Sequence, residues 1–178
     1  MLMLYTIKQK FILDVLKKLG CVRRRQLHAL MRGHFQEGSF EITQASMAAM
    51  LRQLRVGAAD LRMDDELVWL SNQQPDSRRL EAIDVMIELT GGNPQSFEGK
   101  IAPPRLLRFS YGQDSLRVFT VVSLEASPPE LLERFPKERV VWISNSGEAP
   151  QGLVLPPKHF FAARQPDGTH RFYGSNGP

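Results

Sequence analysis

The sequence has very little cysteine: Cys21 is the only one in 178 residues. A single cysteine excludes an internal disulfide and a zinc site built from several cysteines, and it favours a reducing, cytoplasmic setting. Long apolar runs are lacking as well. The apolar opening, residues 1–7, has no basic segment before it and is interrupted at Lys8 and Lys10, and no other run approaches the ~18 residues of a membrane helix. The sequence therefore predicts neither export nor a membrane partner.

The usual catalytic and metal-binding motifs are also lacking. The four histidines show no ligand spacing with Cys21. The run Asn145-Ser146-Gly147 is not the Gly-x-Ser-x-Gly elbow of a hydrolase, and Gly91-Gly92 follows a helical pattern rather than a strand, so it is no phosphate loop. We therefore expect a protein that is not an enzyme and has no cofactor and no bound metal.

Positive charge is concentrated in the first third of the chain. Residues 1–59 carry ten Lys or Arg side chains against three carboxylates, whereas the remainder carries 13 against 16. The whole chain has a formal net charge of +4. An excess confined to one small segment indicates a surface for phosphate, and hence a nucleic-acid partner.

The first 71 residues have the pattern of three helices followed by a hairpin. Apolar residues recur at helical spacing over 7–19 and 23–32, and a third helix begins after a Thr43 cap. Two strand-like runs, 61–63 and 67–70, then flank an acidic turn. In this α+β chain the order predicts an N-terminal winged helix-turn-helix domain, residues 1–71.

A second, small mixed α/β domain is expected over residues 78–178, after a polar segment with proline at 71–77. Its predicted elements are a helix at 79–89 closed by Gly91-Gly92, a hairpin of 105–111 with 116–124, a strand at 140–143, and a hairpin of 159–164 with 169–173. Ser127-Pro128-Pro129-Glu130 has the form of a capping box, which predicts a helix through Phe135.

Two features of the first domain point to DNA. On the third helix, the face opposite the apolar stripe is rich in alanine, which can touch a thymine methyl in the major groove, while Arg and Gln can reach base edges. The run Arg23-Arg24-Arg25 opens the second helix, where arginine forks can bind phosphate oxygens. The predicted DNA-binding residues are Arg23, Arg24, Arg25, Ser46, Ala49, Arg52, Gln53 and Arg55.

Both features have a second interpretation. An alanine-rich face can pack on another helix or on a second subunit, and a charge run can simply be solvated. The turn Asp64-Asp65-Glu66 carries three carboxylates where DNA-binding wings commonly present basic residues, and the segment 33–42 is longer than the turn of a plain helix-turn-helix. Either the wing stays off the duplex, or the domain binds a protein partner or a second copy.

Three acidic residues share one face of the helix predicted after the linker. Glu81, Asp84 and Glu88 recur at spacings of three and four. Such a cluster could hold a divalent metal, but it is more often the solvent-exposed stripe of a helix whose other sides are buried. We expect an exposed stripe and no metal.

The N-terminal motifs resemble a known family. Arg25-Gln26-Leu27, the run Met50-Leu51-Arg52-Gln53-Leu54 and the strand pair ending in Trp69-Leu70 are similar to the winged-helix part of the replication-relaxation family of bacterial plasmid and conjugative-element proteins. A related uncharacterised family from integrative elements is more similar still. The resemblance covers about residues 4–70.

The resemblance also implies that the second domain is a degenerate relative of the restriction-endonuclease fold. An active nuclease of that class needs a Glu-x-Lys or Asp-x-Lys on one strand to bind a metal and activate water. The central hairpin here offers Asp114 and Glu125 with no lysine at the required place. The implied domain is catalytically inactive.

These patterns predict a non-enzymatic protein that binds double-stranded DNA in the replication, transfer or transcription control of a mobile genetic element. The alternative is a protein-protein interaction module, such as a homodimer, built on a winged-helix scaffold without DNA affinity.

Overall fold

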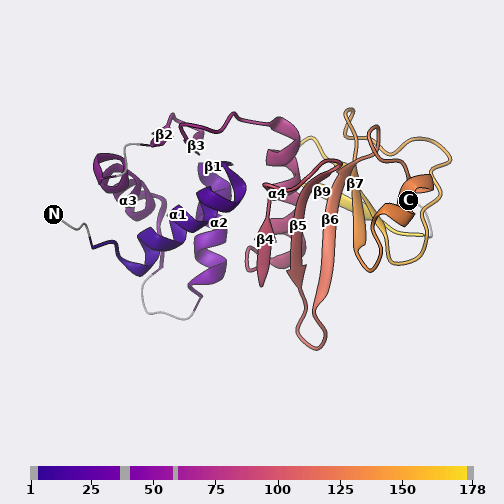
Figure 1. Cartoon of the computed structure of the whole chain (residues 1–178), viewed down its shortest axis with the longest axis horizontal. Coiled ribbons are helices and arrows are strands. Elements are labelled where there is room, and N and C mark those ends of the chain that lie inside the picture. The colour runs from indigo at the N-terminus through magenta and orange to yellow at the C-terminus, as the bar shows by residue number, and fades with distance from the viewer. Residues whose placement is uncertain (1–3, 37–40, 58–59, 176–178) are drawn as a thin grey trace.

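The computed structural model describes residues 4–36, 41–57 and 60–175 and has a mixed α+β architecture (Figure 1). The elements in chain order are α1 (Ile7–Leu19), β1 (Cys21–Arg23), α2 (Arg24–His34), α3 (Gln44–Gly57), β2 (Leu61–Met63), β3 (Leu67–Leu70), α4 (Ser77–Thr90), β4 (Ser96–Glu98), β5 (Arg105–Tyr111), β6 (Arg117–Ser123), the 3₁₀ helix η1 (Pro129–Arg134), β7 (Arg139–Ile143), β8 (Phe160–Arg164) and β9 (His170–Tyr173).

The first 70 residues combine three helices with a small antiparallel sheet. The helices predicted from the apolar spacing are present, and Thr43 caps α3 as expected, because its Oγ1 accepts the Ser46 N–H at 3.1 Å. The strands 61–63 and 67–70 are confirmed as β2 and β3. Strand β1 was not predicted: it directly follows Gly20 (φ 81°) and pairs with β3, so the strand order is β1-β3-β2.

The rest of the chain forms a six-stranded sheet in the order β4-β5-β6-β7-β8-β9. Strands β6, β7 and β8 are parallel and the other pairs are antiparallel. Neighbouring residues of β7 serve opposite faces: Val141 and Ile143 belong to the core shared with α4, whereas Val140 and Trp142 pack with Phe135 on the other side. The sheet is therefore covered on both faces, by α4 and by the segment that contains η1.

Two expectations for this part were wrong. The segment predicted as a helix from the Ser127 capping box is the short 3₁₀ helix η1, and its N-cap is Pro128. Ser127 is buried, and its carbonyl accepts the indole N–H of Trp142 at 2.7 Å, so the chain folds inward there. The segment 91–104, expected to be loose, contains β4, which pairs with β5.

A single buried apolar cluster extends across both parts of the chain. It joins Ile12, Leu27 and Leu51 of the three helices to Ile83 of α4 and Phe109 of β5. Figure 1 shows α4 between the three-helix part and the sheet. The connecting segment 71–76 runs from β3 to α4, and the two parts meet through this core.

The backbones of the two parts are in close contact where α2 passes the end of α4. Gly91 closes α4 in the left-handed conformation, as predicted, and Gly92 follows it. A Cβ built on Gly33 would collide with the Gly92 carbonyl, and a Cβ on Gly92 would lie 2.6 Å from the Ala29 carbonyl oxygen. Backbone thus packs directly on backbone, and this contact requires glycine on both sides.

We expect Gly33→Ala to lower the free energy of unfolding by about 1–3 kcal/mol, the usual cost of overpacking. The sign of this change in unfolding free energy is informative because Gly33 lies inside α2, where alanine would otherwise stabilise the helix by about 1 kcal/mol. Urea denaturation measures the change. Arg32→Ala is the control, since Arg32 pairs with Glu41 on the surface and should cost less than about 1 kcal/mol. A Gly33→Ala variant as stable as the native chain would contradict the close contact.

Candidate functional site

Two of the three acidic residues on this face of α4, Glu81 and Asp84, are buried, so the expectation of a solvent-exposed stripe was wrong for them, whereas Glu88 is exposed as expected. Glu81 and Asp84 are each only 6% exposed, and both lie within ion-pair distance of arginines from other elements. Burying two carboxylates is costly unless they are paired. Their partners therefore define a polar site in the middle of the molecule.

Asp84 joins α4 to the start of α2. Its two oxygens accept hydrogen bonds from Arg25 Nη1 and Nη2 at 2.8 and 2.7 Å, from Arg23 Nη1 at 3.0 Å and from Gln26 Nε2 at 2.8 Å. Gln26 also donates to the Leu80 carbonyl and accepts the Arg23 N–H. Two of the three arginines in the run Arg23-Arg24-Arg25, which was predicted to contact phosphate, are thus bound to a carboxylate of the same chain.

Glu81 and Glu88 hold the start of β9 against α4. The buried His170 ring lies between them, with Nδ1 2.9 Å from Glu88 Oε1 and Nε2 3.3 Å from Glu81 Oε1. The second oxygen of Glu81 accepts from Arg164 Nη1 at 2.9 Å. Burial alone would lower the pKa of His170, but the hydrogen bonds and charges of Glu81 and Glu88 outweigh it and raise that pKa.

The raised pKa gives a stability effect with a definite sign. Protonated His170 is favoured by folding, so its contribution is complete below the unfolded-state pKa of about 6.5 and is lost as the pH rises through the folded-state pKa. We expect His170→Gln to cost more unfolding free energy at about pH 5.5 than at about pH 8.5 in urea titrations.

His159 is the matched control for that measurement. Burial, and then the nearby Arg139 charge, lower the pKa of His159, so folding favours its neutral form. The cost of His159→Gln should therefore grow in the opposite direction, from acid to alkaline pH. The same pH trend for both variants would contradict the assignment.

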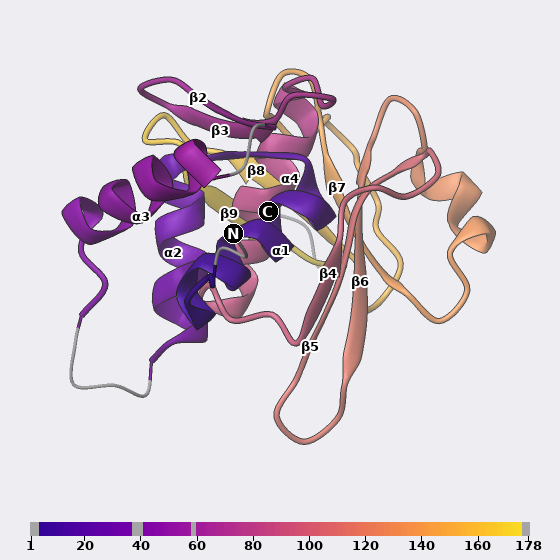
Figure 2. The same cartoon turned by 60° about the vertical axis from the view of Figure 1, so that its left-hand side comes forward.

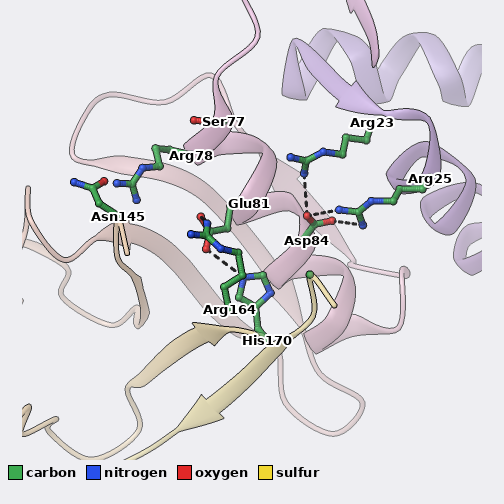
Figure 3. Close-up of a pocket in the computed structure, with 10 residues that line it drawn as sticks. Arg23, Arg25, Ser77, Arg78, Glu81, Asp84, Asn145, Arg164 and His170 are labelled. Atoms are coloured by element: carbon green, nitrogen blue, oxygen red, sulfur yellow. Dashed lines mark hydrogen bonds and ion pairs between the residues drawn. The ribbon is translucent and has the colours of Figure 1, made fainter. Parts of the chain in front are cut away.

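A pocket of about 270 Å³ lies between these groups, at the first turn of α4. Figure 3 shows Arg78 and Asn145 at one end, Glu81 with Arg164 in the middle, and Asp84 with Arg23 and Arg25 at the other end. Asn145 follows β7, and Arg164 is the last residue of β8, which runs parallel to β7. The pocket thus lies at the carboxyl edge of parallel strands, where open α/β sheets commonly bind ligands.

The predicted groove face of α3 lies apart from this pocket. Met47, Leu51 and Leu54 are buried as the stripe requires, while Arg52 and Arg55 are exposed. Figure 2 shows α3 at an outer edge of the molecule, with α1 and α2 on its inner side and the β2–β3 hairpin above it. This face of α3 is solvent-exposed at Arg52 and Arg55 and is therefore accessible to a partner.

The structure does not gather the eight predicted DNA-binding residues on one surface. Ser46, Ala49, Arg52, Gln53 and Arg55 share α3. Ser46 takes part in the N-terminal cap of α3 through its N–H and hydroxyl. Gln53 accepts a hydrogen bond from Gln9 at 2.9 Å. Ser46 and Gln53 are nevertheless exposed.

Arg24 lies beside the acidic turn, where its backbone N–H donates to the Glu66 carbonyl at 2.7 Å. Arg24 is half-buried, and its Nε has no hydrogen-bond partner among the described residues. Asp64 Oδ1 accepts the N–H groups of Leu67 and Glu66, and these bonds hold its pKa below the usual range. Glu66 pairs with Arg23 at 3.1 Å. Asp64 therefore stabilises the turn of the hairpin, and Glu66 contacts the residue before α2.

Four residues that line this pocket were not singled out by the sequence analysis: Arg78, Asn145, Arg164 and His170. They lie on four different elements or loops, and no local pattern connects them. Within residues 4–36, 41–57 and 60–175, no group of three or more His, Cys, Asp or Glu side chains is arranged to hold a metal ion. No helix in the described part of the chain is both long and apolar enough to span a membrane.

Comparisons with known proteins add no relative: no family model matches the chain, nor does any curated protein or solved structure.

Proposed function

We propose that this protein is a non-enzymatic, cytoplasmic DNA-binding protein that contacts duplex DNA through α3. The observation that carries the proposal is the uncovered face of α3, where Arg52 and Arg55 are exposed beside the small residues Ala45 and Ala49. A helix with a low, small-residue face can approach base edges closely, and arginine can read them. The resemblance to plasmid and conjugative-element proteins points to replication, transfer or transcription control of a mobile element.

The order of elements supports a winged-helix scaffold for this contact. A strand between the first two helices pairs with the last strand of the hairpin, and the third helix precedes that hairpin. The proposed DNA contact does not include all the basic residues of the first part of the chain, because Arg23 and Arg25 are bound to Asp84 and the hairpin turn is acidic. Contact is therefore led by α3, with Arg52 nearest the bases and Arg55 at its margin.

The second part of the chain is proposed to be a degenerate restriction-endonuclease-like domain. In support, α4 is followed by the antiparallel strands β4, β5 and β6, and β7 then pairs parallel to β6. Neither β5 nor β6 carries Asp, Glu or Lys, so the residues that such nucleases place on these strands have no counterpart here. This supports a non-catalytic role.

Fluorescence anisotropy against a short duplex tests the proposal. We expect binding at about 50 mM salt and an affinity that falls steeply as salt rises, with a log–log slope of about −2 or steeper, because at least two phosphates are neutralised. The absence of binding at about 50 mM salt would refute DNA recognition by this chain.

The alternative, a protein-interaction module, has one observation in its favour. Val56 lies on the open face of α3 and is 83% exposed, and the nearby start of the chain exposes Leu4 and Ile7. Tyr5 donates a hydrogen bond to the Gly57 carbonyl, which places that segment beside the end of α3. Light scattering distinguishes the two proposals: a dimer that dissociates on Ala49→Glu, together with no DNA affinity, favours the interaction module.

A further inference from the structure

The pocket at the first turn of α4 carries an excess of positive charge. Two carboxylates, Glu81 and Asp84, face a larger number of guanidinium groups there. The arginines that line the pocket are Arg23, Arg25, Arg78 and Arg164. Among the lining residues the excess is two positive charges before His170 is considered, and the two further carboxylates that pair with these arginines, Glu66 and Glu125, lie outside the lining and are solvent-exposed. The pocket is therefore suited to an anionic ligand.

These arginines are not equally engaged within the protein. Asp84 binds Arg23 and Arg25, and Glu81 binds Arg164 at 2.9 Å. Among residues 4–36, 41–57 and 60–175, the ion-pair partner of Arg78 is Glu125, with 4.0 Å between Nη2 and Oε2. Its Nη1 is buried and has no hydrogen-bond partner among the described residues. Buried donors are normally satisfied, so this nitrogen has unused capacity for an acceptor.

The other walls supply neutral donors. Ser77 contributes a hydroxyl group and Asn145 an amide, and Figure 3 shows the Asn145 side chain beside the guanidinium of Arg78. Gly147 (φ 78°) lets the loop after β7 lie against Arg164: its carbonyl accepts the Arg164 N–H at 2.8 Å, and a Cβ there would lie 3.0 Å from that side chain. The geometry therefore combines arginine forks with hydrogen-bond donors in about 270 Å³.

We propose that this pocket binds a phosphate group in its dianionic form, held by the guanidinium groups of Arg78 and Arg164 and by the side chains of Asn145 and Ser77. Planar guanidinium groups match phosphate oxygens in pairs, which a single ammonium group does not do. The site is separate from the α3 face, and it stands whether or not α3 binds DNA.

Isothermal titration of the full chain with inorganic phosphate at low salt tests the proposal. We expect one saturable site, an affinity about tenfold weaker or worse in Arg78→Gln, and an intermediate value in Arg78→Lys, which keeps the charge and loses the fork. Arg117→Gln is the matched control, since Arg117 is exposed at the start of β6 and does not line the pocket. Its phosphate affinity should be unchanged.

The proposal is overturned if the native chain shows no saturable site, or if Arg78→Gln binds phosphate as the native chain does. Circular dichroism checks that the variant is folded. If it is not, Asn145→Leu replaces an exposed loop residue and narrows the mouth of the pocket. Unchanged phosphate affinity in that variant overturns the proposal equally.

A competition experiment identifies the source of the phosphate group. Displacement of bound phosphate by a saturating 5′-phosphorylated duplex, and not by the same duplex without terminal phosphates, assigns the site to a nucleic-acid end. Retention of phosphate in both cases assigns it to a small phosphorylated molecule. Either result supports a phosphate site, and neither depends on the affinity of α3 for the duplex.

Discussion

Replacing Asp84 with alanine should lower the free energy of unfolding by about 3 kcal/mol, at the lower end of the range for breaking a buried ion pair. The Asp84 side chain is 7% exposed and accepts hydrogen bonds from Arg23, Arg25 and Gln26. Without it Arg23, which is 23% exposed, keeps its charge and loses its buried partner, so that its remaining carboxylate partner is the exposed Glu66. The Arg25 side chain is 59% exposed and can turn to water, which limits the loss.

Asp84→Asn separates charge from shape in this prediction. The amide retains one oxygen acceptor but gives up the negative charge. We therefore expect the free energy of unfolding of Asp84→Asn to lie between those of the native chain and the alanine variant. Asp14→Ala is the control: Asp14 and Lys18 form an exposed pair one turn apart, which contributes about 0.5 kcal/mol or less. Equal losses for Asp84→Ala and Asp14→Ala in urea denaturation would show that the Asp84 network does not stabilise the fold.

The charge distribution explains how much of the site could be predicted. The basic excess in the first third of the chain is real, but a count of charges does not say which of them face solvent. Arg23 meets Asp84, which lies 61 residues later in the chain, and Arg164 meets Glu81 across 83 residues. Local spacing placed Glu81, Asp84 and Glu88 on one helix face, and only the distant partners of Glu81 and Asp84 determine that this face is buried at those two residues.

The elements of the fold also differ in whether the local sequence or a distant partner determines them. The helices α1, α3 and α4 carry their own caps and apolar stripes, so their positions follow from the sequence. The strands β1 and β4 have three residues each and exist because β3 and β5 offer them hydrogen-bond partners. Three residues carry no periodicity of their own. Strand β2 is equally short, but the polar turn that joins it to β3 marked the pair as a hairpin.

The capping box at Ser127 failed for a related reason. Its residue types fit a helix start, but the indole N–H of Trp142 requires the Ser127 carbonyl as a buried acceptor. In the same segment, Leu132 and Phe135 pack against the face of the sheet opposite α4. Tertiary packing thus selected a short 3₁₀ helix over a regular one.

Reversing the charge of Arg52 should weaken duplex binding by about 10- to 100-fold, the range of one good base contact with arginine. Arg52 lies on the face of α3 opposite the buried residues Met47 and Leu51, so its side chain can reach a groove without disturbing the core. Arg117→Glu is the matched control because it changes the net charge equally at an exposed position on the β5–β6 hairpin. If DNA responded only to overall charge, both variants would lose affinity alike in anisotropy titrations at one salt concentration. A loss confined to Arg52→Glu assigns the contact to α3, whereas equal losses would contradict α3-led recognition.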